Sequence, residues 1–228
     1  ASGTQIIKVK AIDNEGAFNT DQVTVSAGAY SQTLDKRINS SLDDVEENAN
    51  GSMYTNSSDI EIVADGSRGS QVIGLRFRDL GIPQGATIDE AYIQFTCDET
   101  NTGATSVRIK AHDIDNAPSF ETSNNNVSNR TRTTNSALWE PNSWSSVGSS
   151  GLSERTPELK FILQEIVNKN GWKLENPMVF IIEGTGERTA EAFDGTSSSA
   201  PLLHVSYTVG SQTIPNQNPT SVITSPTN

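Results

Sequence analysis

The stretch of residues 72–97, VIGLRFRDLGIPQGATIDEAYIQFTC, decides the fold. Two segments of alternating apolar and polar residues, 72–78 and 91–97, flank a Gly-Ile-Pro-Gln-Gly connection made of residues that favour turns. Successive side chains of a strand point to opposite faces, so Leu75 and Phe77 share one apolar face and leave the other face polar. Such one-sided alternation is typical of an antiparallel sheet that packs on one side only. The stretch therefore predicts two paired strands at the centre of an all-β domain.

The composition limits what the chain can be and what it can bind. With 228 residues it is long enough for one large all-β domain or for a domain with flanking pieces. The hydrophobic share of 33% is low for a globular protein and favours a core domain with poorer flanks. The formal net charge of -12 opposes binding to the phosphate backbone of nucleic acids and to anionic membranes. We therefore expect no nucleic-acid partner and no membrane partner.

The single cysteine, Cys97, can form no disulfide within the chain and ends an apolar segment, so we expect it to be a small buried residue. No apolar run reaches the ~18 residues that a membrane helix needs, and the first residues lack the pattern of a signal sequence. The chain reads as an internal segment of a longer protein. An acidic β protein rich in Asn and Thr is typical of exported bacterial proteins, so we expect a secreted, extracellular location.

Strand candidates recur between turns rich in Gly, Pro and Asn throughout residues 41–209. They cover residues 41–47, 59–64, 72–78, 91–97, 105–114, 178–184 and 202–209. Regularly spaced short strands indicate an antiparallel β-sandwich of the jelly-roll kind. We therefore expect an all-β fold for the central domain.

One α-helix is predicted near residues 157–170. Thr156 supplies an N-cap and Pro157 a proline in the first turn. An apolar stripe follows at helical spacing, made of Leu159, Ile162, Leu163 and Ile166. We expect this stripe to cap an open end of the sandwich, with Trp172 in the core beside it.

Shorter segments flank the central domain. Residues 1–28 hold two alternating runs joined by an Asp-Asn-Glu-Gly turn, which predicts a β-hairpin. This hairpin resembles the last two strands of a PKD or immunoglobulin-like domain, which serve as spacers in secreted polysaccharide-degrading enzymes. We expect residues 29–40 to be a linker, and residues 210–228 to be an extended, proline-containing linker to the next module.

Acidic residues in two strands predict a cation site. Asp44 and Glu46 share one face of the first strand. Asp59 and Glu61 share one face of the next strand. If these strands are neighbours, four carboxylates converge and repel one another unless a cation lies between them. Carboxylate oxygens suit a structural Ca²⁺ ion, and Asp194 in a glycine-containing turn would complete its site. The alternative is that these acids are solvated charges at strand edges.

A sugar-binding surface requires aromatic faces that stack on pyranose rings and fixed polar groups for hydroxyls or sulfates. The loop-rich region 124–151 offers Trp139 and Trp144 for stacking, although we expect at least one of them to plug the core. The other candidate ligand-binding residues are Arg76, Arg78, Arg130, Arg132, Arg188, Tyr54 and Tyr92. For each arginine alone, the alternative is a surface or salt-bridged role. The polar face of residues 72–97, which carries Arg76, Arg78, Tyr92 and Gln94, is a further candidate for the sugar-facing side.

The sequence indicates no catalytic centre. The two histidines, His112 and His204, lie in predicted strands, and neither a metal-binding HExxH motif nor a nucleophile elbow nor a P-loop occurs. Carboxylates can form an acid pair of the glycosidase type, but they are common in any acidic protein. We therefore expect no catalytic residues and no enzymatic activity.

Several motifs within residues 41–209 resemble a β-sandwich module of secreted bacterial enzymes and surface proteins. They are DDVEE (43–47), SDIEI (58–62), VIGLRF (72–77), IPQGATI (82–88), WEPNSW (139–144), TPEL (156–159) and APLLHVSY (200–207). Together they are similar to the DNRLRE-type carbohydrate-binding modules that are attached to marine polysaccharide lyases and hydrolases. The resemblance implies a non-catalytic jelly roll that often contains calcium.

The leading hypothesis is a monomeric carbohydrate-binding module of a secreted multimodular enzyme from a marine bacterium. It would bind an algal polysaccharide such as agarose, porphyran, carrageenan or alginate and keep the catalytic domain of the same chain close to that substrate. One alternative is a structural or adhesive spacer of a bacterial surface protein. Another is a small lyase or hydrolase that uses an Asp/Glu pair.

Overall fold

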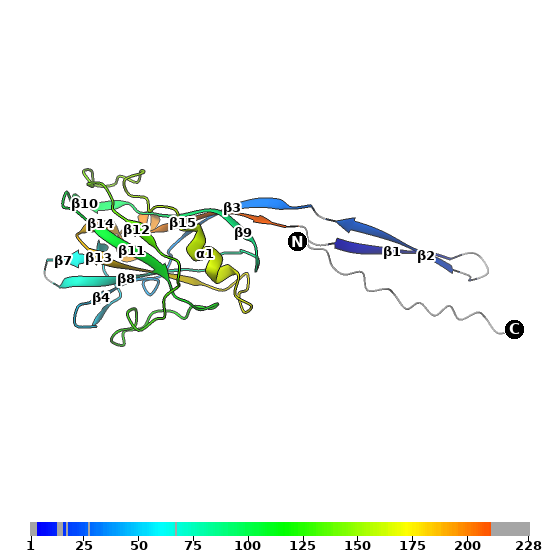
Figure 1. Ribbon diagram of the computed structural model, residues 1–228, viewed down its shortest axis with the longest axis horizontal. Coiled ribbons are helices and arrows are strands. Elements are labelled where there is room, and N and C mark those ends of the chain that lie inside the picture. The colour runs from blue at the N-terminus through cyan, green and yellow to red at the C-terminus, as the bar shows by residue number, and fades with distance from the viewer. Residues whose placement is uncertain (1–3, 13–15, 17, 27, 67, 211–228) are drawn as a thin grey trace. The chain divides into compact units, whose positions relative to one another are not determined.

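The computed structural model describes residues 4–12, 16, 18–26, 28–66 and 68–210. The chain forms two compact units, residues 1–30 with 210–228 and residues 31–209. In the first unit, strands β1 (Thr4–Ile12) and β2 (Phe18–Ser26) pair antiparallel, in agreement with the predicted hairpin (Figure 1). Residues 211–228 of the predicted second linker lie outside the described residues.

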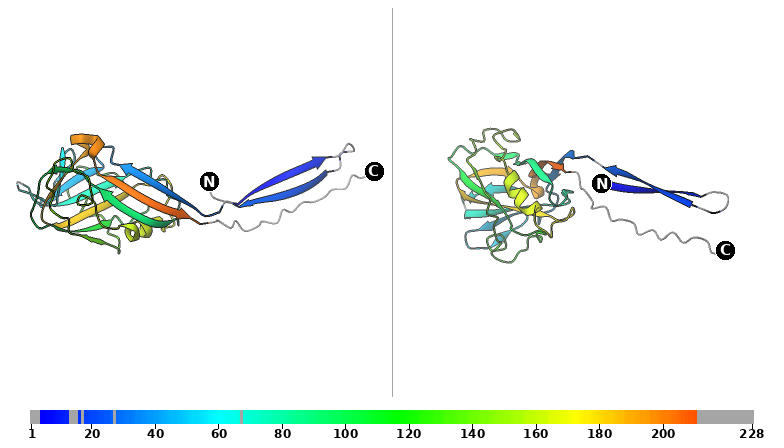
Figure 2. Two further views of the ribbon diagram at one scale, coloured as in Figure 1. Left: turned by 90° about the horizontal axis from the view of Figure 1, so that it is seen from above. Right: turned by 45° about the vertical axis from the view of Figure 1, so that its right-hand side comes forward.

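The second unit is an antiparallel β-sandwich, which confirms the all-β fold class. A seven-stranded sheet in the order β12-β11-β13-β8-β4-β5, with β7 paired to β8, forms one layer. Two three-stranded sheets, β3-β15-β9 and β10-β14-β6, lie across the core from it (Figures 1 and 2). The strands are β3 (Tyr30–Arg37), β4 (Asp44–Asn48), β5 (Met53–Tyr54), β6 (Asp59–Ile62), β7 (Ala64–Asp65), β8 (Gly69–Phe77), β9 (Thr87–Gln94), β10 (Cys97–Glu99), β11 (Ser106–Ala111), β12 (Ala137–Trp139), β13 (Met178–Thr185), β14 (Arg188–Glu191) and β15 (Leu202–Val209).

Strands β8 and β9 do not pair with each other, so the predicted pairing of these two segments is wrong. β8 pairs with β4 and β13, whereas β9 pairs with β15 in the opposite layer. The link between them, residues 78–86, buries Leu80 and Ile82 instead of forming an exposed hairpin turn. Trp172 holds this link, because its indole nitrogen donates to the carbonyl of Ile82 at 2.8 Å. The alternation identified the buried apolar side of both strands, but neither their partners nor the second core that covers the other face of β8, where the expected one-sided packing is wrong.

Residues 30–37, which we expected to belong to a linker, form strand β3 at the edge of the sheet with β15. The chain then stays attached to this sheet, since the backbone nitrogen of Ile38 donates to the carbonyl of Pro201 at 3.0 Å. Ile38 is buried and Leu34 is half-buried, so the segment contributes apolar side chains that its polar composition conceals. The sandwich therefore begins earlier than predicted.

Helix α1 (Lys160–Val167) is shorter than the predicted span of 157–170. Thr156 does not cap it, because its hydroxyl accepts from the backbone nitrogen of Ile93 at 2.9 Å and thereby ties the chain to β9. The apolar stripe packs against β9 and β11, strands of different layers, and Trp172 is buried as predicted (Figure 1). The helix thus lies across one opening between the layers. A second helix, α2 (Phe193–Thr196), and a 3-10 turn, η1 (Ser197–Ser199), precede β15.

A second, smaller core lies on the outer face of the seven-stranded sheet. Residues 112–133 form a long loop over this face, and its Phe120 and Val127 pack on Val45, among other residues, from β4. Gly74 on β8 leaves room for this layer, because a Cβ atom there would lie 2.5 Å from Cζ of Phe120. The loop is therefore anchored by apolar packing, and its polar residues are free to line surface pockets.

Candidate functional site

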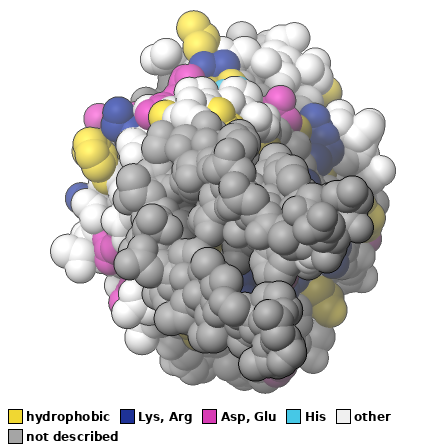
Figure 3. All heavy atoms as spheres, turned by 90° about the vertical axis from the view of Figure 1, so that its right-hand side faces the viewer, with side chains coloured by type: hydrophobic (Ala, Val, Ile, Leu, Met, Phe, Trp, Pro, Cys, Tyr) yellow, Lys and Arg dark blue, Asp and Glu magenta, His cyan; other side chains and the backbone are white. Residues whose placement is uncertain are grey.

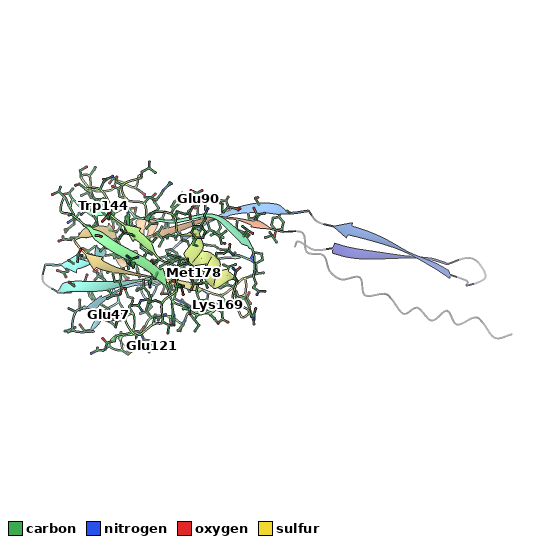
Figure 4. All side chains as sticks on the ribbon, in the orientation of Figure 1. Glu47, Glu90, Glu121, Trp144, Lys169 and Met178 are labelled. Atoms are coloured by element: carbon green, nitrogen blue, oxygen red, sulfur yellow. The ribbon has the colours of Figure 1, made fainter. Side chains whose placement is uncertain are left out.

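The two tryptophans predicted as stacking platforms are both core residues. Trp139 is 5% exposed and Trp144 is 0% exposed, and Phe95 stacks on Trp139 with ring centroids 5.5 Å apart. The indole nitrogen of Trp144 donates to the carbonyl of Ser153 at 2.9 Å, so its polar atom is satisfied inside the fold (Figure 4). We expected at least one of these tryptophans to lie in the core, and both do. Neither therefore presents a ring face to a ligand.

Arg188, a predicted sugar ligand, is a buried structural residue. It is 1% exposed, and its guanidinium donates to the carbonyls of Asn142 at 3.0 Å, Pro141 at 3.0 Å and Gly103 at 2.9 Å. Burial lowers the pKa of this guanidinium. The side chain joins two loops to β14 and has no face left for a ligand.

Arg76 and Arg78, on the predicted sugar-facing surface, are paired with one carboxylate. Asp43 is buried, and its two oxygens lie 2.9 Å from Nη1 of Arg76 and 2.8 Å from Nε of Arg78. Two charge-assisted contacts compensate for the burial of Asp43. We therefore assign this trio to the structure of the sheet.

Arg130 and Arg132 lie in the long loop, and both are engaged within it. Arg130 stacks over Phe120 at 4.3 Å and donates to the carbonyl of Pro118 at 3.0 Å. Burial, followed by the nearby charge of Arg76, lowers the pKa of Arg130 to about 10. Arg132 donates to backbone carbonyls of the loop and lies 3.7 Å from a carboxylate oxygen of Glu183. Among the side chains visible in Figure 3, basic and acidic groups are interspersed and form no patch of one sign.

The two predicted tyrosine platforms are covered by other side chains. Arg68 lies over the ring of Tyr54 at 3.8 Å. Arg155 lies over the ring of Tyr92 at 3.8 Å, and His204 stacks on Tyr92 with centroids 4.6 Å apart. Both rings therefore have stacking partners within the protein.

The five acids predicted to form one cation site are distributed over separate contacts. Asp44 accepts a hydrogen bond from the backbone nitrogen of Phe193 at 2.8 Å, and burial raises the pKa of its carboxyl to about 7. Asp194 is exposed and accepts from the hydroxyl of Ser41 at 2.8 Å. Of the remaining three, Asp59 and Glu61 belong to β6, and Glu46 of β4 lies beside that strand. The structure therefore does not form the single cage that the sequence predicted.

Glu46 lies against the edge of β6. One oxygen of its carboxyl accepts from the backbone nitrogen of Glu61 at 2.8 Å, and the other lies 3.6 Å from Arg68. Burial raises the pKa of Glu46 well above its ordinary value, and the neighbouring carboxyl of Glu61 acts in the same direction. The raised pKa favours the neutral form of Glu46, which lessens the repulsion between this carboxyl and that of Glu61. The predicted proximity of these two strands is correct.

A different group of carboxylates could hold a metal ion. Oxygen atoms of Asp59, Asp98 and Glu99 all lie within 4.8 Å of one another, on β6 and β10. Burial, followed by the charges of Glu191 and Asp59, raises the pKa of Asp98. Only Asp59 was among the predicted ligands. Asp98 and Glu99 follow the apolar segment that ends at Cys97, which is buried and unpaired as predicted.

Two adjoining polar pockets lie where the long loop meets the seven-stranded sheet. The first, about 370 Å³, is lined by Glu47 and Val72 on the outer face of the sheet, by Glu183, and by the loop residues Asn125 and Ser128, among others. Glu47 and Val72 are cross-strand partners on β4 and β8, so both lie on the same face of the sheet and line this pocket together. The prediction for region 124–151 rested on its tryptophans and arginines and did not include the amides of residues 124–126.

The second pocket, about 310 Å³, shares Asn125 with the first and also has Asn124, Asn126, His112 and Arg130 among its lining residues. Burial and the charge of Arg130 lower the pKa of His112 to about 4, so its ring is neutral at pH 7. A run of three asparagines, residues 124–126, was the sequence signal that could have identified this site.

Asn125 is held between the two pockets by its backbone. Its φ angle is 61°, in the left-handed region that asparagine tolerates better than most residues. Its backbone nitrogen donates to the carbonyl of Gly51 at 2.8 Å, which joins the loop to the β4–β5 turn. Gly51 itself has φ of 83°, and a Cβ atom there would lie 2.2 Å from Oδ1 of Asn125. The backbone of Asn125 and the close approach of Gly51 therefore hold the side-chain amide of Asn125 in place.

Comparison with protein families and with curated proteins gives no relative of this chain: no family model matches it, and neither does any curated protein. Neither described helix has the length and apolar character needed to cross a membrane. Function therefore has to be argued from the pockets and the carboxylates themselves.

Proposed function

We propose that residues 31–209 form a non-catalytic carbohydrate-binding module. The observation that carries this proposal is the pair of adjoining polar pockets on the outer face of the seven-stranded sheet. Amides donate and accept hydrogen bonds, and carboxylates accept them, as sugar hydroxyls require. In the first pocket, Asn125, Ser128 and Glu183 supply such groups around the apolar floor of Val72. The pockets together offer adjoining positions to consecutive sugar units.

The class of glycan follows from the resemblance rather than from the pockets. We propose an algal polysaccharide such as agarose, porphyran, carrageenan or alginate, and a secreted, multimodular parent enzyme. A weak tethered module then raises the effective concentration of the substrate at the catalytic domain.

A variant that fills the first pocket tests the site. Ser70 is exposed and lines this pocket, so Ser70→Tyr would occupy the space that a sugar needs. Ser150 is exposed and lines neither of the two pockets, so Ser150→Tyr is the matched control. In affinity electrophoresis we expect the polysaccharide that retards the wild type to retard Ser150→Tyr equally and Ser70→Tyr much less. Equal retardation of both variants would remove the pocket from the proposal.

The proposal includes a structural calcium ion, held by carboxylates and without contact to the glycan. A ligand that binds only the folded state stabilises it by mass action, about 2.7 kcal/mol at a hundredfold excess over Kd. We therefore expect chelation to lower the melting temperature by roughly 5–10 °C for a domain of this size. An unchanged melting curve, with no metal found by elemental analysis, would exclude the ion.

The second candidate function is a structural or adhesive spacer. The observation that favours it is the covering of every predicted aromatic platform, Trp139, Trp144, Tyr54 and Tyr92, by other parts of the protein. Absence of retardation on every glycan would support this alternative. Release of reducing or unsaturated ends from a polysaccharide would instead show that the module is catalytic.

A further inference from the structure

The carboxylates of β6, β10 and β14 gather on one face of their sheet. In the pairing of β14 with β6, Thr189 lies opposite Glu61 and Glu191 lies opposite Asp59. Direct cross-strand partners point to the same face, so these four side chains share it. Ile60 and Ala190, which point to the opposite face, are 1% and 0% exposed and belong to the core. The acidic face is therefore the outer face of this sheet.

An irregularity in β10 adds two more carboxylates to this face. The register shifts between Cys97 and Glu99, where Glu99 lies opposite Thr189. Such a bulge lets neighbouring residues turn toward one side of a sheet. Asp98 and Glu99 thereby both come within 4.8 Å of an oxygen of Asp59. Three carboxylates at this separation repel one another unless a cation or protons lie between them.

A neutral oxygen on the same face points to a ligand independently of the acids. Thr189 is 1% exposed, and its hydroxyl oxygen Oγ1 has no hydrogen-bond partner in the described part of the chain. A buried hydroxyl without a partner destabilises the folded state. By register it lies between Glu99 on one side and Glu61 on the other. A cation at this position would satisfy the hydroxyl that the protein leaves unpaired.

We propose that this face of the β10-β14-β6 sheet binds a Ca²⁺ ion through the carboxylates of Asp59, Asp98 and Glu99 and the hydroxyl oxygen of Thr189. The inference rests on the structural ion of the proposed function and names its ligands. Calcium takes oxygen ligands at about 2.3–2.6 Å, so oxygens on opposite sides of the ion lie about 4.6–5.2 Å apart. The three carboxylate oxygens all lie within 4.8 Å of one another, so an ion between them could contact all three. An all-oxygen ligand set without histidine or cysteine favours calcium over zinc.

The ion would join the strands of this sheet and the loop beside it. Asp59 belongs to β6, Thr189 to β14, and Asp98 and Glu99 to β10. The backbone nitrogen of Thr189 donates to Oδ1 of Asn101 at 2.9 Å. Asn101 in turn exchanges backbone hydrogen bonds of 3.0 and 2.9 Å with Trp144. Asn101 therefore contacts both Trp144 and Thr189, one of the proposed ligands.

The position of Trp144 provides a direct test with terbium, a lanthanide that occupies calcium sites and emits when a nearby tryptophan is excited. We expect the full chain to show saturable terbium emission under tryptophan excitation, and we expect Ca²⁺ to displace it. Absence of saturable emission would overturn the proposal. The terbium titration contains no polysaccharide, so its result is independent of glycan binding. Failure of the glycan proposal would leave the terbium signal in place.

Two variants test the ligands, and one serves as a control. Asp98→Asn removes one charged ligand and should weaken terbium binding on the order of tenfold or more, because calcium affinity follows the number of charged ligands. Asp79→Asn makes the same change at an exposed residue of the 78–86 link with φ of 52°, and should bind as the wild type does. Wild-type affinity in Asp98→Asn would overturn the proposal.

Thr189→Val keeps the shape of the side chain and removes only its hydroxyl, so it remains informative if Asp98→Asn fails to fold. We expect weaker terbium binding in this variant and no change in its circular dichroism. Wild-type affinity in folded Thr189→Val would contradict the assigned ligand set.

Discussion

Burial of the Asp44 carboxyl raises its pKa to about 7, and the charges of Asp194 and Asp43 act in the same direction. The unfolded chain releases this proton near pH 4, whereas the folded protein keeps it until about pH 7. The folded state thus binds more protons between these values, so this residue makes stability fall as pH rises from about 4 to about 7.

The variant Asp44→Asn tests this titration. Asn keeps an oxygen to accept the hydrogen bond from Phe193 but carries no ionisable group. We expect its free energy of unfolding, measured in urea at pH 4, 5.5 and 7, to decline less with rising pH than that of the wild type. An identical pH dependence in both proteins would contradict the assigned pKa.

Gly74 is a position where the outer core packs closely on strand β8. The Cβ atom introduced by Gly74→Ala would lie 2.5 Å from Cζ of Phe120 and 3.1 Å from Cγ2 of Val45. We expect this variant to lose about 1–3 kcal/mol of stability, as other overpacked cores do. Gly103→Ala is the control, because a Cβ atom at Gly103 meets nothing within 4 Å. Urea unfolding of the two variants measures the difference, and equal stability would show that Phe120 does not pack as described.

At the scale of elements, the link between β8 and β9 shows what a local pattern can predict. The alternation in residues 72–78 and 91–97 correctly indicates which side of each strand is buried, because the period of two is a property of the strand itself. The partner of each strand depends on residues far away in sequence, β13 and β4 for one and β15 for the other. A connection with buried Leu80 and Ile82 resembles a turn in composition but crosses between layers.

Trp172 tests this link between layers. Trp172→Phe keeps an aromatic ring but removes the donor to the carbonyl of Ile82. We expect a loss of about 1–3 kcal/mol in the free energy of unfolding, since a buried carbonyl is left without its partner. Hydrogen exchange should also become faster at backbone amides of residues 78–86. Unchanged stability and exchange would show that the link is held by its apolar residues alone.

The candidate sites were harder to predict from the sequence than the sheets. Asp59 was selected because acids alternate in its strand, whereas Asp98 and Glu99 lie in a bulge that follows no alternation. Trp139 and Trp144 were selected as aromatic residues in a loop, but burial depends on the packing of that loop against Phe95. Side-chain type predicts what chemistry a residue can perform, and tertiary packing decides whether it is available.

At the scale of the whole molecule, the two candidate sites lie on different faces of the sandwich. The outer face of the seven-stranded sheet carries the polar pockets, whereas the carboxylates lie on the outer face of the β10-β14-β6 sheet. An ion on one face and a glycan on the other would share no ligand. Removal of calcium should therefore lower stability more than it lowers glycan affinity, at temperatures where the protein remains folded.

The measurement that tests glycan binding most directly is affinity electrophoresis of the full chain on gels that contain agarose, porphyran, carrageenan or alginate. We predict that at least one polysaccharide retards the wild type, and that Ser70→Tyr migrates faster than the wild type on that gel while Ser150→Tyr does not. Unretarded migration of the wild type on all four gels would contradict the proposal that this domain binds an algal polysaccharide.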